Sequence, residues 1–160
     1  MNRHYTAEEY EHLARKLREA FKDATITTDV LVGFPTETEE DFNTTLDFCK
    51  RVAFEKAHVF PYSVRENTVA ARMEQHTNAV KDERASRLSA VMNEIRKEYL
   101  NNQKGKTVDV LFEVHKNGFN EGYTKNYTPV RVFTQENYQG EIKQVTIKNA
   151  VNDYCEGEII

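Results

Sequence analysis

The sequence has few of the features that mark several large classes of protein. Its two cysteines, Cys49 and Cys155, lie far apart and match neither metal-site nor disulfide spacing. No apolar run approaches the roughly 18 residues of a transmembrane helix, and the polar N-terminus lacks a signal-peptide core. We therefore expect a cytoplasmic protein that does not contact the membrane and has no metal site of its own.

A surplus of positive charge is also missing. The formal net charge is -4 and the isoelectric point is about 5.8, so no global basic field indicates a nucleic-acid-binding protein. Any contact with RNA or DNA would have to be local. The chain has 160 residues, of which 39% are hydrophobic and 30% charged, and this composition is typical of one medium domain or two small ones.

The first hundred residues alternate between helix and strand patterns. A capping box at Thr6–Glu9 predicts a helix to about Lys22, with Tyr10, Leu13, Ala14, Leu17 and Phe21 on one face. The β-branched run 25–32 predicts a parallel strand buried on both faces. A second helix begins near Thr38, with an apolar stripe of Phe42, Leu46, Cys49, Val52 and Ala53, and a second strand covers about 56–62.

This order predicts β/α units with parallel strands, but two strands cannot close a barrel or complete a doubly wound sheet. Strands at 25–32 and 56–62 would lack neighbours at their edges. The pattern therefore indicates either a piece of a longer protein or a chain that pairs with a partner.

A different pattern follows a long loop (63–79) and a helix at about 80–102. From Thr107 apolar residues recur at every second position, and turn signals at 117–118, Gly122 and Gly140 separate further strands near 130–133 and 142–147. We place a domain boundary near Lys104, with a small antiparallel barrel or sandwich behind it. The predicted fold class is α/β followed by all-β.

Both predicted strands of the first domain stop at an aromatic-proline turn. Gly33, Phe34 and Pro35 end the first, with the Glu37 carboxylate close behind, and Phe60, Tyr62 and Arg65 end the second. The carboxyl ends of parallel strands are where α/β folds bind ligands, aromatic faces suit a purine, and Arg65 suits a carboxylate. Taken alone, the first turn is better explained as a structural connection, and Arg65 as half of a surface ion pair with Glu66 or Glu37. His58, inside the second strand, is better explained as a packed or hydrogen-bonded histidine than as a ligand.

The segment 122–131 places aromatic, amide and basic residues together in a β-strand context. Such a composition can stack bases and hold phosphates, and the candidates are Tyr123, Lys125, Asn126, Tyr127 and Arg131. Residues 105–160, however, contain six Lys and Arg against eight acidic residues, which attracts RNA poorly. The residues alone favour an ordinary polar hairpin.

Taken together, several runs resemble one family. They are Met1–Thr6, Thr27–Val30, Val32–Phe42 and His58–Ser63, and they resemble the radical S-adenosylmethionine methylthiotransferases that modify tRNA. The likeness is strongest to the branch that acts on N6-threonylcarbamoyladenosine. Residues 105–157 resemble that family's C-terminal TRAM domain, a small β-barrel that binds tRNA.

The resemblance implies that residues 1–104 are the C-terminal portion of a partial radical-SAM β/α barrel and 105–160 a TRAM-like barrel. It implies S-adenosylmethionine and [4Fe–4S] clusters as cofactors of the complete enzyme, whose cluster cysteines are absent from this sequence. The chain would then be inactive without the other half. The turn residues named above would line the cofactor and substrate side, and Tyr123, Lys125, Asn126 and Tyr127 would face tRNA.

Three positions depart from the family's usual pattern. Thr36 stands where the family commonly has glycine, and the run Ser63–Thr68 lacks the family's usual proline and glycine, with Val64 and Asn67 in their places. These losses should relax the second loop. Two alternatives stay open: a non-catalytic RNA-binding module, and a fragment of another radical S-adenosylmethionine enzyme.

Overall fold

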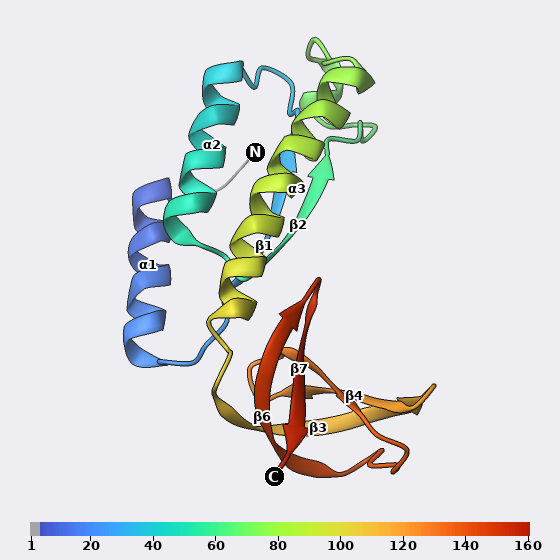
Figure 1. Cartoon of the computed structure of the whole chain (residues 1–160). Helices are drawn as coiled ribbons and strands as arrows, with labels where there is room; N and C mark the ends of the chain where they lie inside the picture. Colours follow the sequence, from blue (N-terminus) through green and yellow to red (C-terminus); the bar gives the residue numbers. More distant parts are fainter. Residues whose placement is uncertain (1–3) are drawn as a thin grey trace. The chain divides into compact units, whose positions relative to one another are not determined.

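The computed structural model describes residues 4–160, which form two compact units, 4–95 and 96–160. Residues 1–3, the start of the Met1–Thr6 run compared above, lie outside the described residues. The first unit contains α1 (Ala7–Ala20), β1 (Thr27–Val32), α2 (Glu39–Val52), β2 (Lys56–Pro61), the short 3-10 helix η1 (Ala70–Arg72) and most of α3 (Asn78–Asn101). The second contains β3 (Thr107–Lys116), β4 (Phe119–Thr124), β5 (Pro129–Phe133), β6 (Ile142–Val151) and β7 (Tyr154–Ile159) (Figure 1).

The first two helices begin at the predicted caps. The Thr6 side chain accepts a hydrogen bond from the Glu9 amide, and the Glu9 carboxylate accepts one from the Thr6 amide. Thr38 and Asp41 form the same reciprocal pair at the start of α2. These bonds satisfy amides that the first helical turn leaves without partners, which is why both starts could be predicted from sequence.

Strands β1 and β2 pair in parallel, as predicted, and the helices cover one face of this sheet (Figure 1). The predicted burial of β1 on both faces is wrong. Val30, Val32 and Val59 pack into the core that the helices share, while the alternate residues point to the opposite face. In register on that face, Asp29 stands beside His58 and Leu31 beside Phe60.

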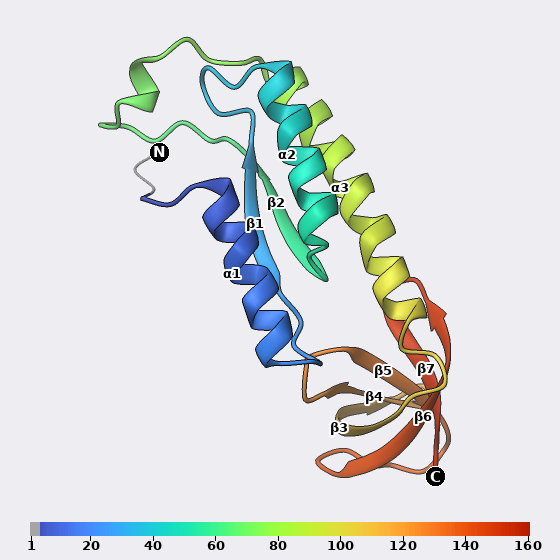
Figure 2. The ribbon, with the colours of Figure 1, turned by 90° about the vertical axis from the view of Figure 1, so that its left-hand side faces the viewer.

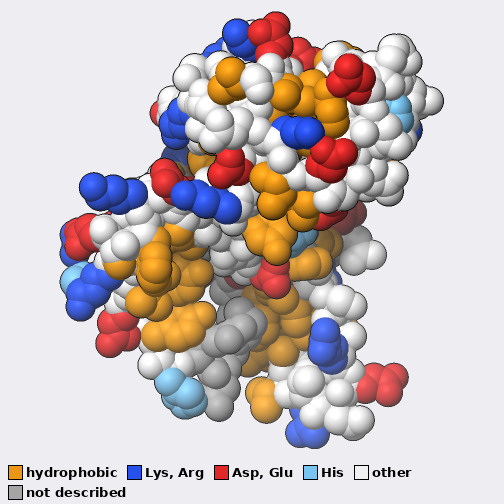
Figure 3. Space-filling model, turned by 90° about the horizontal axis from the view of Figure 1, so that it is seen from below, with side chains coloured by type: hydrophobic (Ala, Val, Ile, Leu, Met, Phe, Trp, Pro, Cys, Tyr) orange, Lys and Arg blue, Asp and Glu red, His pale blue; other side chains and the backbone are white. Residues whose placement is uncertain are grey.

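The apolar face of α1 is only partly buried. Tyr10 and Ala14 join the core, where the Tyr10 ring meets those of Phe48 and Phe54 at 6.0 and 5.9 Å. The other members of its predicted apolar face, Leu13, Leu17 and Phe21, are exposed. Figure 3 shows that hydrophobic side chains gather in patches on the face of the molecule that is seen from below.

The second unit is a five-stranded sheet that closes on itself in the order β3-β4-β5-β7-β6. All neighbours are antiparallel except β5 and β7, which pair in parallel, so the sheet is mixed and the expected purely antiparallel arrangement is wrong. Its core contains Val110, Phe112, Val130 and Val145, together with Leu100 from the last turn of α3. Figure 2 shows the curved strands from a second direction.

Two further features of this unit differ from the expectation. Gly122 does not mark a turn: it lies inside β4, where an added Cβ would stand 2.1 Å from the Leu111 carbonyl oxygen, so the close approach of β3 requires glycine. Strand β7 was not predicted, because its sequence, Tyr154–Ile159, alternates only weakly between apolar and polar residues. Among residues 4–160, no helix combines the length and apolarity needed to span a bilayer.

Candidate functional site

The turn after β1 is held together by the carboxylate of Glu37, which lies at the end of the turn and bonds back to its start. Gly33, at φ 70°, donates its amide hydrogen to Glu37 Oε1 at 3.0 Å, and the Glu37 amide donates to the Phe34 carbonyl at 2.9 Å. An added Cβ on Gly33 would lie 2.7 Å from Lys81 Cγ. Glycine is therefore required both by the left-handed backbone and by the close passage of α3.

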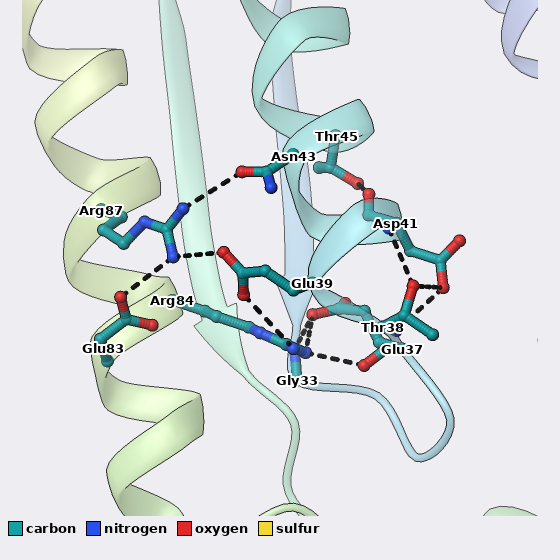
Figure 4. A network of polar contacts seen from close by, with 10 residues as sticks. All are labelled: Gly33, Glu37, Thr38, Glu39, Asp41, Asn43, Thr45, Glu83, Arg84 and Arg87. Carbon is teal, nitrogen blue, oxygen red and sulfur yellow. Dashed lines mark hydrogen bonds and ion pairs between the residues drawn. The ribbon is translucent and has the colours of Figure 1, made fainter.

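The side chain of Arg84, a residue of α3, extends to the same turn and holds it (Figure 4). Its guanidinium donates to Glu37 Oε1 at 2.6 Å and to the Glu37 carbonyl at 3.0 Å, and it lies 3.7 Å from Glu39 Oε2. The side chain is almost fully buried. Arg87, one turn further on, is more exposed and bonds Glu39, Glu83 and Asn43. The network ties the first turn of α2 to α3 and leaves the Glu37 carboxylate occupied by protein donors.

The face of the sheet that the helices leave open forms the floor of a large hollow. Its volume is about 1160 Å³. The hollow is lined by Asp29 and Leu31 of β1, Phe34 of the first turn, Phe60 to Ser63 and Arg65 of the second, Thr68 to Ala70, Met73 and Tyr5. Phe60 keeps half of its surface exposed, and the rings of Phe34 and Tyr62 meet edge-to-face at 5.3 Å. An apolar hollow with a few charged groups at its wall is typical of small-ligand sites.

Tyr62 is the most buried aromatic residue of this wall. Its hydroxyl is buried and has no hydrogen-bond partner among the described residues. Lys81 Nζ lies 5.5 Å from the centre of its ring, within cation–π range. An unsatisfied buried hydroxyl is uncommon in proteins, so the Tyr62 oxygen is available to a ligand or a water.

The structure divides the residues predicted from sequence into two groups. Phe34, Phe60, Tyr62 and Arg65 are brought together around the hollow. Gly33, Pro35 and Glu37 do not line it; Pro35 is fully buried, and the other two shape the turn. All seven stay candidates for cofactor binding, four through direct contact and three through support of the turn.

Sequence reasoning missed several residues of this wall. Asp29 and Leu31 could have been found, because residues that alternate along a strand share one face with the turn that follows it. Lys81 and Arg84 gave no signal, since a cation in a helix usually lies in solvent. His58 is exposed on the open face, beside Asp29, rather than packed inside the strand.

Two of the positions at which the family has glycine, and this chain does not, keep the backbone conformation that glycine favours. Thr36 has φ 75° and Asn67 has φ 64°, both in the left-handed region. Asparagine tolerates this region, whereas a β-branched threonine is strained there. The turn at Thr36 therefore stores strain, which the Glu37–Arg84 network holds in place.

In the second unit the β4–β5 hairpin presents the residues predicted to face RNA. Tyr123 and Tyr127 are exposed with ring centres 6.3 Å apart, and Lys125 is exposed between them. Asn126 is turned inward, where its amide donates to the Tyr99 hydroxyl and its oxygen accepts from the Thr128 hydroxyl. Arg131 is paired with Glu121 at 2.5 Å, and this hydrogen bond raises the pKa of Arg131.

The described residues offer no cluster of metal ligands. Residues 4–160 contain no group of three or more His, Cys, Asp or Glu side chains that could hold a metal ion. Cys49 and Cys155 are each buried in a hydrophobic core, and burial raises the pKa of both thiols to about 11. A [4Fe–4S] cluster held by three cysteines therefore does not fit the residues described here.

Known proteins match this chain from end to end. A tRNA-2-methylthio-N(6)-dimethylallyladenosine synthase of Caldicellulosiruptor saccharolyticus is 40% identical over 163 residues, which cover 100% of this chain and 35% of that protein. The chain belongs to the tRNA methylthiotransferase family. The threonylcarbamoyladenosine tRNA methylthiotransferase MtaB of Bacillus subtilis is 38% identical over 166 residues, covering 100% of the chain and 37% of that protein.

The chain thus spans about a third of the length of the curated methylthiotransferases that it matches. A second Bacillus subtilis relative, a tRNA-2-methylthio-N(6)-dimethylallyladenosine synthase, is 38% identical and is covered to 32% of its length. No protein-family profile matches the chain. The resemblance to this family that was inferred from the sequence is confirmed. Relatives named for dimethylallyladenosine and for threonylcarbamoyladenosine match the chain at similar identity.

Proposed function

We propose that this chain is the C-terminal part of a tRNA methylthiotransferase that adds a methylthio group to C2 of a modified adenosine in tRNA. The observation that supports this most is the open face of the β1–β2 sheet, where Phe34, Phe60, Tyr62 and Arg65 surround one hollow. Aromatic faces, a guanidinium and a buried hydroxyl suit S-adenosylmethionine and an adenine base. In the complete enzyme, S-adenosylmethionine and [4Fe–4S] clusters would supply the radical chemistry, with the cluster ligands outside this chain.

The first unit, in this proposal, is the last portion of a β/α barrel, and the rest of the enzyme completes it. Two observations support this. Among the described residues β1 pairs only with β2, and the exposed stripe Leu13, Leu17 and Phe21 on α1 offers apolar surface that a neighbouring helix would bury. The chain alone would then be inactive, and the assembled enzyme would act in the cytoplasm, where tRNA is modified.

Within the family we propose the branch that acts on N6-threonylcarbamoyladenosine, with Arg65 as the partner of the substrate's carboxylate. The threonylcarbamoyl group ends in a carboxylate, for which a guanidinium at the wall of the hollow is a suitable partner, whereas a dimethylallyl group is a hydrocarbon. The second unit, as a TRAM-like barrel, would hold the tRNA, with Tyr123, Lys125 and Tyr127 facing it and Asn126 and Arg131 fixing the hairpin.

Assembly with the missing part can be tested by co-expression. The part of Bacillus subtilis MtaB that this chain does not cover, carrying an affinity tag, should retain the chain during purification. Replacing Leu13 and Leu17 by Asp should abolish retention, while replacing Ile142, an exposed residue of the second unit, by Asp should not. Equal retention of all three forms, or none of the unsubstituted chain, would contradict the proposal.

A further inference from the structure

The outer face of the β4–β5 hairpin carries a row of aromatic side chains longer than sequence reasoning indicated. Across the two strands Phe119 stands opposite Phe133, Glu121 opposite Arg131, and Tyr123 opposite Pro129. Residues two apart on a strand share a face, so these three pairs lie side by side on the outside of the barrel. We call the aromatic members Phe119, Phe133, Tyr123 and Tyr127 the hairpin stripe.

The hairpin stripe consists of two ring pairs. Phe119 and Phe133 have ring centres 5.8 Å apart, and Tyr123 and Tyr127 have theirs 6.3 Å apart. Phe133 is 61% exposed and Tyr127 is 80% exposed. The pairs are four residues apart along β4, or about 13 Å. Each pair therefore presents its own aromatic surface to solvent.

Tyr127 is held in a conformation that its side chain does not favour. Its φ is 60°, in the left-handed region, although its ring gains little from packing inside the protein. The loop around it is fixed by hydrogen bonds: the Tyr127 amide donates to the Thr124 carbonyl at 2.9 Å, and Thr128 bonds Tyr99 and Thr124. Strain maintained by a rigid loop at an exposed aromatic residue is typical of a binding surface.

The charges along the stripe are few: one carboxylate, Glu121, and three cations, Arg131, Lys116 and Lys125. Arg131 lies 4.9 Å from the Phe119 ring centre and 4.0 Å from that of Tyr154, but Glu121 neutralises it. Lys116 Nζ lies 5.8 Å from the Phe119 ring. The exposed rings of Phe133, Tyr123 and Tyr127 are therefore the surfaces that the stripe offers for stacking, whereas cations lie over the Phe119 ring. Few cations accompany these rings, so the field that could attract phosphates is weak.

We propose that the hairpin stripe binds unpaired RNA bases by stacking, with one base at the Phe119–Phe133 pair and another at Tyr123–Tyr127. The inference rests on the proposed RNA-binding role of the second unit and adds the mode: single-stranded RNA, read by ring faces rather than by phosphate contacts. A duplex keeps its bases stacked inside, so the stripe would discriminate a loop from a stem.

The test measures binding of the full chain to a short RNA hairpin with an unpaired loop and to the same stem as an uninterrupted duplex. The hairpin should bind more tightly. Phe133→Ala and Tyr127→Ala should each weaken hairpin binding by roughly fivefold to a hundredfold, the range expected for one lost base stack. Raising the salt from about 50 to about 200 mM should weaken binding by less than about tenfold.

Two variants separate this role from a structural one. Ile142→Ala removes an apolar side chain that is 67% exposed on β6 and should leave RNA binding unchanged. Tyr127→Asn should raise the midpoint of thermal unfolding, because Asn tolerates the left-handed region, and should still weaken hairpin binding. A stabilised variant with weaker binding cannot be explained by misfolding.

Equal affinity for hairpin and duplex would overturn the stacking mode, as would unchanged hairpin affinity in both alanine variants. Loss of affinity in Ile142→Ala to the same degree would overturn the assignment to this stripe. Each result is independent of the enzyme assignment, because co-expression with the missing part reports on the first unit, whereas hairpin binding reports on the second.

Discussion

Arg84 Nη1 lies 2.6 Å from Glu37 Oε1, and both side chains are largely buried beneath the turn that ends β1. The same carboxylate oxygen accepts the Gly33 amide hydrogen. One ion pair thereby connects α3, the start of α2 and the wall of the hollow. The position of Phe34, which lines that hollow, depends on it.

Removing Arg84 should be far more damaging than removing its neighbour Arg87. Arg84→Ala leaves the Glu37 carboxylate buried without its cation, and we expect a loss of about 3–5 kcal/mol in the free energy of unfolding of the first unit. Arg87→Ala breaks exposed contacts to Glu39 and Glu83 and should cost less than about 1 kcal/mol.

Hydrogen exchange provides the local measurement. In Arg84→Ala the amides of Gly33 and Glu37 should lose their protection, whereas in Arg87→Ala they should keep it. Similar protection in the two variants would show that the buried ion pair does not hold the turn.

Thr36→Gly should stabilise the protein. At φ 75° a β-branched side chain is strained, and glycine adopts this conformation without that cost, so we expect a gain of about 1 kcal/mol even after the entropy that glycine loses on folding. Thr44→Gly, at an exposed position of α2, is the control and should destabilise by roughly 0.3 kcal/mol, the difference between the helix propensities of the two residues. Urea unfolding of both variants measures the difference, and a loss of stability in Thr36→Gly would argue against strain at this turn.

Alkaline pH should weaken the fold through its two buried thiols. Burial raises the pKa of Cys49 and of Cys155 from 9.0 to about 11, so above about pH 9 the unfolded chain releases protons that the folded chain retains. Stability that is fully present below pH 9 is therefore lost as pH rises toward 11, by up to about 1.4 kcal/mol per pH unit for each thiol.

The measurement is the urea midpoint between pH 8 and about pH 10.5. Cys49→Ala, which removes one of the two thiols, should show a shallower decline with pH than the unsubstituted chain, whatever its stability at pH 8. Identical slopes in the two proteins would show that Cys49 does not contribute.

Much of the fold could be predicted from the sequence, because its signals are local. Capping boxes at Thr6 and Thr38 marked two helix starts, and the alternation after Thr107 marked the β unit. Features that depend on distant segments could not be predicted in this way. Gly122 resembles a turn signal until β3 is seen to pass against it, and β7 forms only by pairing with β5 and β6.

For the candidate site, too, local features could be predicted from the sequence and long-range contacts could not. The two aromatic-proline turns were visible as motifs, and the structure brings Phe34, Phe60, Tyr62 and Arg65 together. Nothing in the sequence connected Glu37 to Arg84, forty-seven positions later, and so its carboxylate was expected to be available to a ligand. On the hairpin, Tyr123 and Tyr127 were found from local composition, whereas Phe133 became part of the stripe only through its register with Phe119.

The most direct test of the central claim joins this chain to the part of Bacillus subtilis MtaB that it does not cover. The fusion, with reconstituted clusters, is incubated with S-adenosylmethionine and tRNA carrying N6-threonylcarbamoyladenosine, and the nucleosides are analysed by mass spectrometry. We expect the methylthio derivative to form, and Phe60→Ala to reduce its yield at least tenfold, about 1.4 kcal/mol, while Ile142→Ala, at an exposed position of β6 that does not line the hollow, leaves it unchanged. A folded, cluster-loaded fusion that yields no methylthio product would contradict the account.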